Sequence, residues 1–98
     1  MAAYMVVFAR IKDRERFLKE YGVPNGEIVK KYGGEYVIRT PKVTALENGF
    51  SEGASVVISK WPDRAAIERF WNSPEYAPLK AARQPLADCD VFIVEDPQ

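Results

Sequence analysis

Residues 3–11, AYMVVFARI, decide the fold because both faces of the strand they form are apolar. In an extended chain alternate side chains point to opposite faces, so Met5 and Val7 share one face. Val6 and Phe8 share the other face. A strand with one face in water would alternate apolar with polar residues. The segment is therefore predicted to be a strand that is covered on both sides.

The rest of the chain predicts three more strands and two helical regions. The strands are expected at 35–40, 54–61 and 90–95, and the helices at 14–32, 63–71 and 73–84. Asp13 is a suitable N-cap for the first helix, and Pro24 is expected to kink it or divide it into two pieces. Pro41 ends the second strand, after which residues 42–47 could continue as a short extended piece and 49–53 form a loop.

This order of strand, helix, strand, strand, helix, strand is that of an α+β, ferredoxin-like domain. One domain over residues 1–98 is expected, with an antiparallel sheet and both helical regions on one face. The helices cover only that face, whereas the first, third and fourth strands are apolar on both faces. A second copy of the same sheet is the simplest cover. The pattern therefore predicts a homodimer.

The composition excludes several classes of function. The chain has 14 basic and 14 acidic residues, and this balance does not favour nucleic-acid binding. Its apolar runs are too short to cross a membrane, no signal peptide is predicted at its start, and it has one cysteine. A cytoplasmic location is expected. With no histidine and one cysteine, neither a metal site nor any cofactor is predicted.

Several segments resemble a known bacterial family, the domain of unknown function 1330 within the dimeric α/β-barrel superfamily. They are Lys31–Arg39 (KYGGEYVIR), Leu46-Glu47, Phe70–Tyr76 (FWNSPEY), Lys80, Arg83 and Ile93–Glu95 (IVE). The resemblance implies a dimer in which two sheets face each other as a barrel, and no established reaction. Relatives in the wider superfamily include cofactor-free monooxygenases and a muconolactone isomerase.

Two arginines are candidates for binding an anion. Arg39 ends an otherwise apolar strand, and its guanidinium suits a carboxylate, although an ion pair with Glu47 or Glu95 would explain it equally. Arg83 lies one helical turn after Lys80 and could line the same cavity as Arg39. The alternative is a solvated helix end in which both cations favour the helix dipole.

The residues around the Ser-Pro turn are the next candidates. Trp71 and Tyr76 could form the wall of a cleft, and the Tyr76 hydroxyl could act as an acid, although core packing is the commoner role. Asn72 and Ser73 could bind ligand, but helix capping accounts for Ser73.

The candidate general bases are two carboxylates, Glu47 and Glu95. Burial would raise the pKa of either towards neutrality. An ion pair or a strand-end charge is the alternative for both. Cys89 lies between Asp88 and Asp90, whose charges disfavour a thiolate, so a nucleophilic role is not expected.

Two functions remain open at the level of sequence. The first is a pocket between helices and sheet for a small organic ligand, anionic or aromatic, with or without cofactor-free monooxygenase- or isomerase-like chemistry. The second is a non-catalytic module that senses a ligand or only assembles. An enclosed cavity beside the Ser-Pro turn, lined by Arg39 and Arg83, would favour the first.

Overall fold

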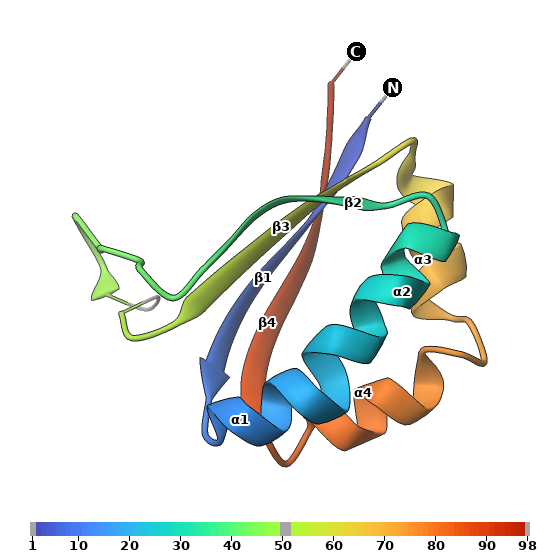
Figure 1. Cartoon of the computed structure of the whole chain (residues 1–98). Coiled ribbons are helices and arrows are strands. Elements are labelled where there is room, and N and C mark those ends of the chain that lie inside the picture. Colours follow the sequence, from blue (N-terminus) through green and yellow to red (C-terminus); the bar gives the residue numbers. More distant parts are fainter. Residues whose placement is uncertain (1, 50–51, 98) are drawn as a thin grey trace.

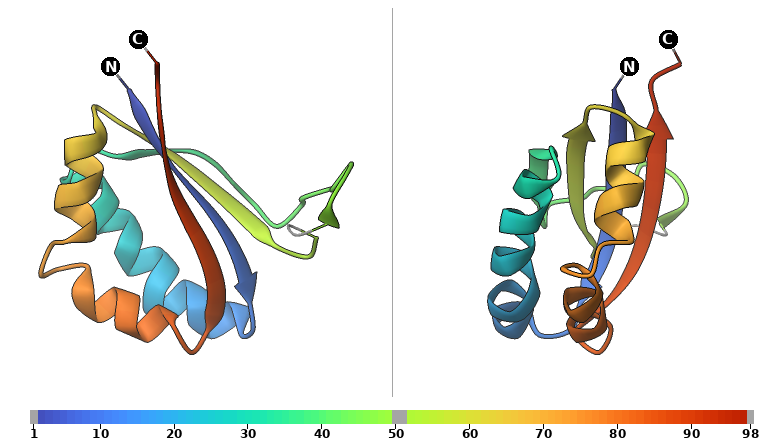
Figure 2. Two further views of the ribbon diagram at one scale, coloured as in Figure 1. Left: turned by 180° about the vertical axis from the view of Figure 1, so that it is seen from behind. Right: turned by 90° about the vertical axis from the view of Figure 1, so that its right-hand side faces the viewer.

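A computed structural model describes residues 2–49 and 52–97 of the chain. Its four strands form one antiparallel sheet in the order β2-β3-β1-β4, and the helices all lie on one face of it (Figures 1 and 2). The strands are β1 (Ala3–Ile11), β2 (Glu35–Thr40), β3 (Ser55–Trp61) and β4 (Ala87–Glu95). The helices are α1 (Arg14–Phe17), the π-helix η1 (Leu18–Gly22), α2 (Val23–Lys31), α3 (Arg64–Trp71) and α4 (Ala77–Arg83). This architecture confirms the predicted α+β, ferredoxin-like fold.

The first helical region is continuous, and its irregularity precedes the proline. The Asp13 side chain accepts a hydrogen bond from the Arg16 backbone N–H at 3.1 Å, as an N-cap does. One π-helical segment, η1, then separates α1 from α2. Pro24 lies in the first turn of α2, where its missing N–H costs little. The region is therefore one helix whose irregular segment lies at Leu18–Gly22, and the break expected at Pro24 does not occur.

The second helical region has a turn where a helix start was expected. The Ser73 hydroxyl donates to the Phe70 carbonyl at 2.8 Å and accepts from the Tyr76 backbone N–H at 3.1 Å. Ser73 thus caps a turn over 74–76, whereas α4 begins at Ala77 with Pro78 in its first turn. Pro78 sets that start because the ring is tolerated only where no helical N–H is needed.

Two further boundaries differ from the expected ones. Strand β4 begins three residues earlier, because residues 87–89 continue the pairing with the end of β1. Residues 42–47 form no strand. In the expected loop 49–53, positions 50 and 51 lie outside the described residues.

The core lies between the sheet and helix α3. Trp61, Ile67, Phe70 and Tyr76 are its largest fully buried side chains. The Trp61 and Phe70 rings lie 5.2 Å apart between centroids, and the indole N–H donates to the Ser59 hydroxyl at 2.9 Å. This end of the helix-covered face is therefore fully packed.

The face of the sheet without helices is apolar and partly exposed. One row of paired residues crosses all four strands: Ile38, Ile58, Val6 and Phe92. Phe92 is 49% exposed and Ile38 is 46% exposed. Four neighbouring apolar side chains in one row match the two-faced pattern found in the sequence, and they leave a surface that favours burial against another molecule.

Candidate functional site

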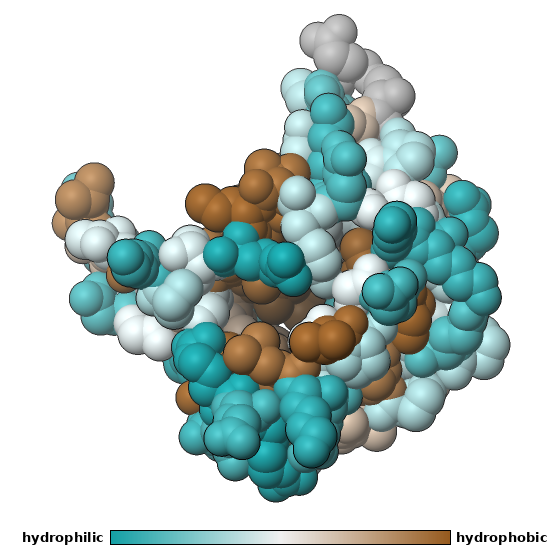
Figure 3. Space-filling view, in the orientation of Figure 1, coloured by the Kyte–Doolittle hydropathy of each residue, from teal (hydrophilic) through white to brown (hydrophobic). Residues whose placement is uncertain are grey.

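A cavity of about 420 Å³ lies between the sheet and the helices, away from the packed end of the core. Its lining comes from all four strands and from the α1–η1–α2 and α3–α4 regions. Figure 3 shows the molecular surface hollowed between the sheet and the first helical region, with hydrophobic side chains beside the hollow. Leu18 and Val23 line the cavity and are exposed, so they belong to its mouth. The volume suits a small organic molecule.

The charged residues that line the cavity are all arginines. Arg14, Arg39 and Arg83 contribute to the lining, and no aspartate, glutamate or lysine does so among the described residues. None of the three arginines forms an ion pair within 2–49 and 52–97. All formal charges in the described lining are therefore positive, and such a lining favours an anionic ligand.

Arg83 is the most unusual of the three because it is only 8% exposed. A buried guanidinium normally has a carboxylate partner, since its charge loses the solvation of water. Here one terminal nitrogen donates to the Tyr76 hydroxyl at 3.3 Å. The guanidinium also lies 5.8 Å from the Tyr21 ring centroid and 6.0 Å from that of Trp71. These contacts offset part of the desolvation, and a bound anion would offset the rest.

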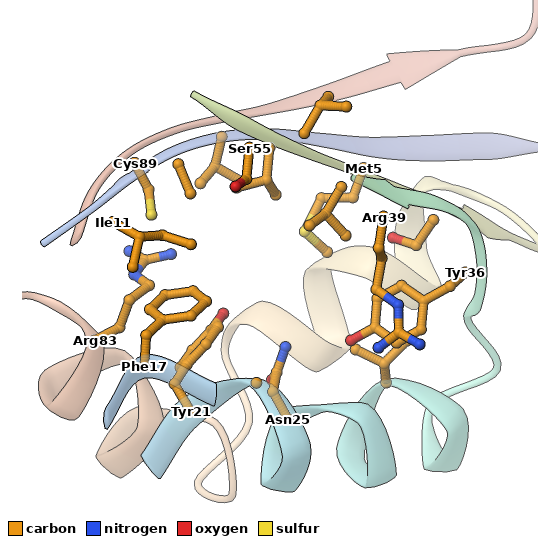
Figure 4. A pocket seen from close by; sticks show the side chains of 18 of the residues that line it. Met5, Ile11, Phe17, Tyr21, Asn25, Tyr36, Arg39, Ser55, Arg83 and Cys89 are labelled. Atoms are coloured by element: carbon orange, nitrogen blue, oxygen red, sulfur yellow. The ribbon is translucent and has the colours of Figure 1, made fainter. Parts of the chain in front are cut away.

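A hydrogen-bonded chain links Arg83 to Tyr21. The Tyr76 and Tyr21 hydroxyl oxygens lie 2.9 Å apart. Since a guanidinium can only donate, the Tyr76 oxygen accepts from Arg83, and either phenol can be the donor in the bond between Tyr76 and Tyr21. The Tyr21 hydroxyl is directed towards the cavity (Figure 4). Arg83 and Tyr21 thus place a cation and a neutral hydroxyl at one end of the cavity.

Arg39 reaches the cavity because strand β2 contains a β-bulge. Tyr36 pairs with Ser59, but Ile38 pairs with Ile58, so Val37 is an extra residue on β2. In a regular strand, residues three apart point to opposite faces. The bulge brings Tyr36 and Arg39 to the same face, where the guanidinium lies 4.3 Å from the Tyr36 ring centroid. Figure 4 places this pair at the end of the cavity opposite Arg83.

Two further polar groups lie between these ends. Arg14 donates to the Ser55 hydroxyl at 3.1 Å, which joins α1 to the start of β3. Asn25 is only 8% exposed, and its side-chain oxygen is buried without a hydrogen-bond partner among the described residues. A buried amide oxygen without a donor is costly. A ligand hydroxyl or a water molecule would remove that cost.

The other ionisable groups that line the cavity are neutral at physiological pH. Burial raises the pKa of the Tyr21, Tyr36 and Tyr76 hydroxyls above the ordinary value. Burial also raises the pKa of the Cys89 thiol, although the charge of Arg83 opposes this. The cavity therefore offers positive charge and neutral donors, and no side-chain base is present among its described lining residues.

Four of the candidate residues from the sequence line this cavity: Arg39, Trp71, Tyr76 and Arg83. Lys80 lies outside the lining, with its ammonium 4.4 Å from the Trp71 ring centroid. Asn72 and Ser73 lie next to the cavity, but their side chains bond to backbone groups: Asn72 donates to the Glu68 carbonyl at 3.0 Å. Their proposed contact with ligand remains a prediction.

The structure places the two candidate general bases outside the cavity. Glu47 is exposed on the segment 41–49, which extends away from the helices (Figure 1). Glu95 ends β4 and accepts from Arg64 at 3.3 Å on the surface. A proton-transfer role for either stays a prediction without support from this geometry.

Sequence reasoning did not identify Arg14, Tyr21 or Asn25 as site residues. Tyr21 was assigned to the apolar stripe of the first helix, and that assignment is compatible with both a core and a cavity wall. An asparagine next to Pro24 looks like turn chemistry. A buried asparagine within a helix indicates a possible binding residue. Its burial can be recognised only when it is known which side of the helix faces the sheet.

Other kinds of site find no support in the described ranges. Within residues 2–49 and 52–97 there is no cluster of three or more acidic or cysteine side chains that could hold a metal ion. None of the helices in those ranges has both the length and the hydropathy needed to cross a bilayer.

The chain belongs to the family described as domain of unknown function 1330, whose model matches residues 2–97. This confirms the resemblance seen in the sequence. No curated protein matches the chain.

Solved structures show the same fold at low sequence identity. A protein of unknown function from Rhodopseudomonas palustris is 20% identical with a TM-score of 0.79, and the alignment covers 99% of this chain and 83% of the Rhodopseudomonas chain. A dimeric ferredoxin-like protein of unknown function from Jannaschia is 11% identical with a TM-score of 0.77, covering 98% and 100%. SnoaB, a cofactor-independent oxygenase from Streptomyces nogalater, is 16% identical with a TM-score of 0.72, covering 99% and 94%.

Proposed function

We propose that this protein binds a small organic anion with a flat, apolar body in the cavity between the sheet and the helices. The observation that carries the proposal is the buried Arg83 guanidinium, which lines the cavity without a carboxylate partner among the described residues. An unpaired buried charge is destabilising and is retained where a ligand of opposite charge compensates it.

The shape of the ligand follows from the walls of the cavity. Phe17, Tyr21 and Trp71 line it from the helices, and Met5 and Val7 line it from the sheet. Aromatic side chains in such a wall favour a planar ligand, because ring stacking adds to apolar burial. An anionic aromatic compound therefore fits the cavity better than a sugar or a nucleotide, whose many hydroxyls would find few partners.

A second candidate function is cofactor-free oxygenation of such an anion. The fold similarity to the cofactor-independent oxygenase SnoaB favours it. In this chain Arg83 and Tyr21 would stabilise negative charge on a substrate oxygen, as donors preorganised for an oxyanion do. Because no side-chain base lines the described part of the cavity, the substrate would have to enter already ionised.

We also propose that the protein acts as a homodimer whose two open sheet faces cover each other. The row of Ile38, Ile58, Val6 and Phe92 supports this, since it is a continuous apolar surface on the face without helices. The dimeric neighbour from Jannaschia has the same fold. Dimerisation through that face would leave the cavity on the opposite face unobstructed.

A pair of fluorescent probes tests the binding proposal. The probe 8-anilino-1-naphthalenesulfonate is anionic, and N-phenyl-1-naphthylamine has the same rings without the charge. We expect the anionic probe to bind the purified protein at least tenfold more tightly than the neutral one. Arg83→Met should remove that preference and leave binding of the neutral probe within about twofold, since the apolar walls remain.

The matched control is Arg69→Met, which removes an exposed arginine from α3 outside the cavity. Arg83→Lys keeps the charge without the planar fork and should retain part of the preference. Equal binding of both probes to the wild-type protein, or an unchanged preference in folded Arg83→Met, would contradict the proposal. Consumption of dissolved oxygen with a bound phenolate substrate would favour the second candidate over simple binding.

A further inference from the structure

We propose that the ligand carries two anionic groups at opposite ends of a rigid body, one bound by Arg83 and the other by Arg39. This inference rests on the proposed function and narrows its ligand class to aromatic dianions, such as dicarboxylates. The observation behind it is that two guanidiniums without carboxylate partners in the described chain lie at the two ends of one cavity (Figure 4).

The first end is built from helix α4 and the π-helix. Arg83 and Tyr21 converge there, with the Tyr76 hydroxyl between them. Arg83 can only donate, and the Tyr21 hydroxyl can donate to a ligand when it accepts from Tyr76. A carboxylate suits this end, because its two oxygens can accept from both groups and its charge compensates that of Arg83.

The second end exists because of the bulge at Val37. If Val37 instead paired with Ile58 in a regular strand, Arg39 would lie three residues from Tyr36 in unbroken alternation and would point to the open side of the sheet. The bulge turns it to the helix-covered side, where it pairs opposite Val57, another cavity residue. Bulges commonly re-aim a side chain next to a binding site. Stacking on the Tyr36 ring then holds the guanidinium plane in place.

The space between the two ends suits a rigid spacer. Ser55 and Met5 line it from the sheet side, and Asn25 lines it from the helix side. Among the described lining residues no acidic side chain repels a second carboxylate. The unpartnered Asn25 oxygen adds an acceptor in this stretch, so a ring bearing a hydroxyl group would be matched there as well.

Calorimetric titration with matched carboxylates tests the inference. The probes are naphthalene-2-carboxylate and naphthalene-2,6-dicarboxylate, with benzene-1,4-dicarboxylate and biphenyl-4,4′-dicarboxylate as shorter and longer dianions and benzoate and biphenyl-4-carboxylate as their single-charge partners. We expect at least one dicarboxylate to bind about tenfold more tightly than its monocarboxylate at the same ionic strength. Arg39→Gln should abolish that advantage and leave the monocarboxylate affinity unchanged. Arg69→Gln, on the outer surface of α3, should change neither.

The outcomes separate this inference from the proposed function. If the monocarboxylates bind through Arg83 but no second carboxylate adds affinity, the two-ended ligand is wrong and the anion site stands. If Arg39→Gln weakens both carboxylate classes equally, Arg39 acts only through the general field and the inference is also overturned. If no carboxylate binds and Arg83→Met has no effect on any probe, the proposed function itself is wrong.

Discussion

On the helix-covered face of the sheet, polar side chains such as Ser55, Arg39 and Arg83 gather around a hollow, whereas the open face presents a row of Val6, Ile38, Ile58 and Phe92. A monomeric domain usually has the reverse arrangement, with a dry interior and a polar exterior. Both departures cost free energy in the isolated chain. The two proposals would each account for one of these departures: an anion for the covered face and an apolar surface for the open one.

The largest expected effect comes from placing a charge at the centre of the open face. Val6→Glu should convert a dimer to a monomer, because an unpaired carboxylate buried at an interface costs about 3 to 5 kcal/mol. That corresponds to a rise of more than a hundredfold in the dimer dissociation constant. Sedimentation equilibrium measures it. Ala65→Glu, which adds the same charge on the exposed surface of α3, should leave the dimer intact. A dimer retained in Val6→Glu would mean that the open face is not the interface.

The next effect sharpens the contrast between the packed and hollow ends of the covered face. A Cβ at Gly34 would lie 2.7 Å from two atoms of the Trp61 ring and 2.8 Å from a Val29 methyl. Gly34→Ala should therefore lower the free energy of unfolding by about 1 to 3 kcal/mol, as overpacking does. At Gly26 the nearest atom, on the Tyr36 ring, is 3.8 Å away, so Gly26→Ala should be neutral or stabilising. Chemical denaturation distinguishes them, and equal stabilities would contradict the packing described at Trp61.

A smaller effect of opposite sign is expected at Arg83. Arg83→Met removes a buried charge without an acidic partner among the described residues and keeps most of the apolar stem. In the absence of ligand the variant should be more stable by about 1 kcal/mol, since apolar replacements of buried charges are neutral or stabilising. Thermal unfolding with and without an anionic probe measures this. Destabilisation in the absence of ligand would mean that Tyr76 and the neighbouring rings already satisfy the guanidinium.

The smallest effect lies at the surface link between α2 and the Ser-Pro turn. Glu75 forms an ion pair with Lys31 and accepts from the Tyr32 hydroxyl, and the bonds from Lys31 and then Tyr32 lower the pKa of Glu75 from 4.5. A lowered folded-state pKa adds stability above the unfolded-state value, and that stability is lost as the pH falls through the folded value. Glu75→Gln should therefore unfold at a slightly lower temperature than wild type at pH 7. The two unfolding temperatures should converge as the pH falls below 4.5 and through the lowered folded-state pKa. A constant difference across that range would show that the charge of Glu75 does not matter.

The apolar pattern of the sequence was sufficient for the fold. In 3–11 both faces are apolar, which predicted helices on one side and a further cover on the other; the helices are present, and the second cover stays a prediction. The element order then specified the sheet topology, which the structure confirms. The helix boundaries near Pro24 and Pro78 were less predictable. A proline can stand in the first turn of a helix or mark a break in it, and the neighbouring residues do not distinguish the two cases.

The site was only partly accessible from the sequence. Arg39 and Arg83 were chosen by residue type and family resemblance, and the bulge that directs Arg39 inwards leaves no mark in the order of residues 35–40. Tyr21 has the same helical spacing in a core as in a cavity wall. Glu47 and Glu95 were chosen because they are acids in segments that resemble the family. The direction in which the 41–49 segment extends depends on tertiary structure, so the sequence could not show that Glu47 lies away from the cavity.

Both long walls of the cavity contain one residue more than a regular element would hold. Strand β2 has its extra residue at Val37, and the π-helix η1 widens the helical turn that carries Tyr21. Deletion of Val37 would restore a regular strand and leave Tyr36 and Arg39 two residues apart, so both would still face the cavity. Deletion of one residue in η1 would instead rotate the side chains on one side of that turn relative to the other, while Trp61 and Phe70 would keep their packing. The helical wall is therefore the one whose shape depends on its extra residue.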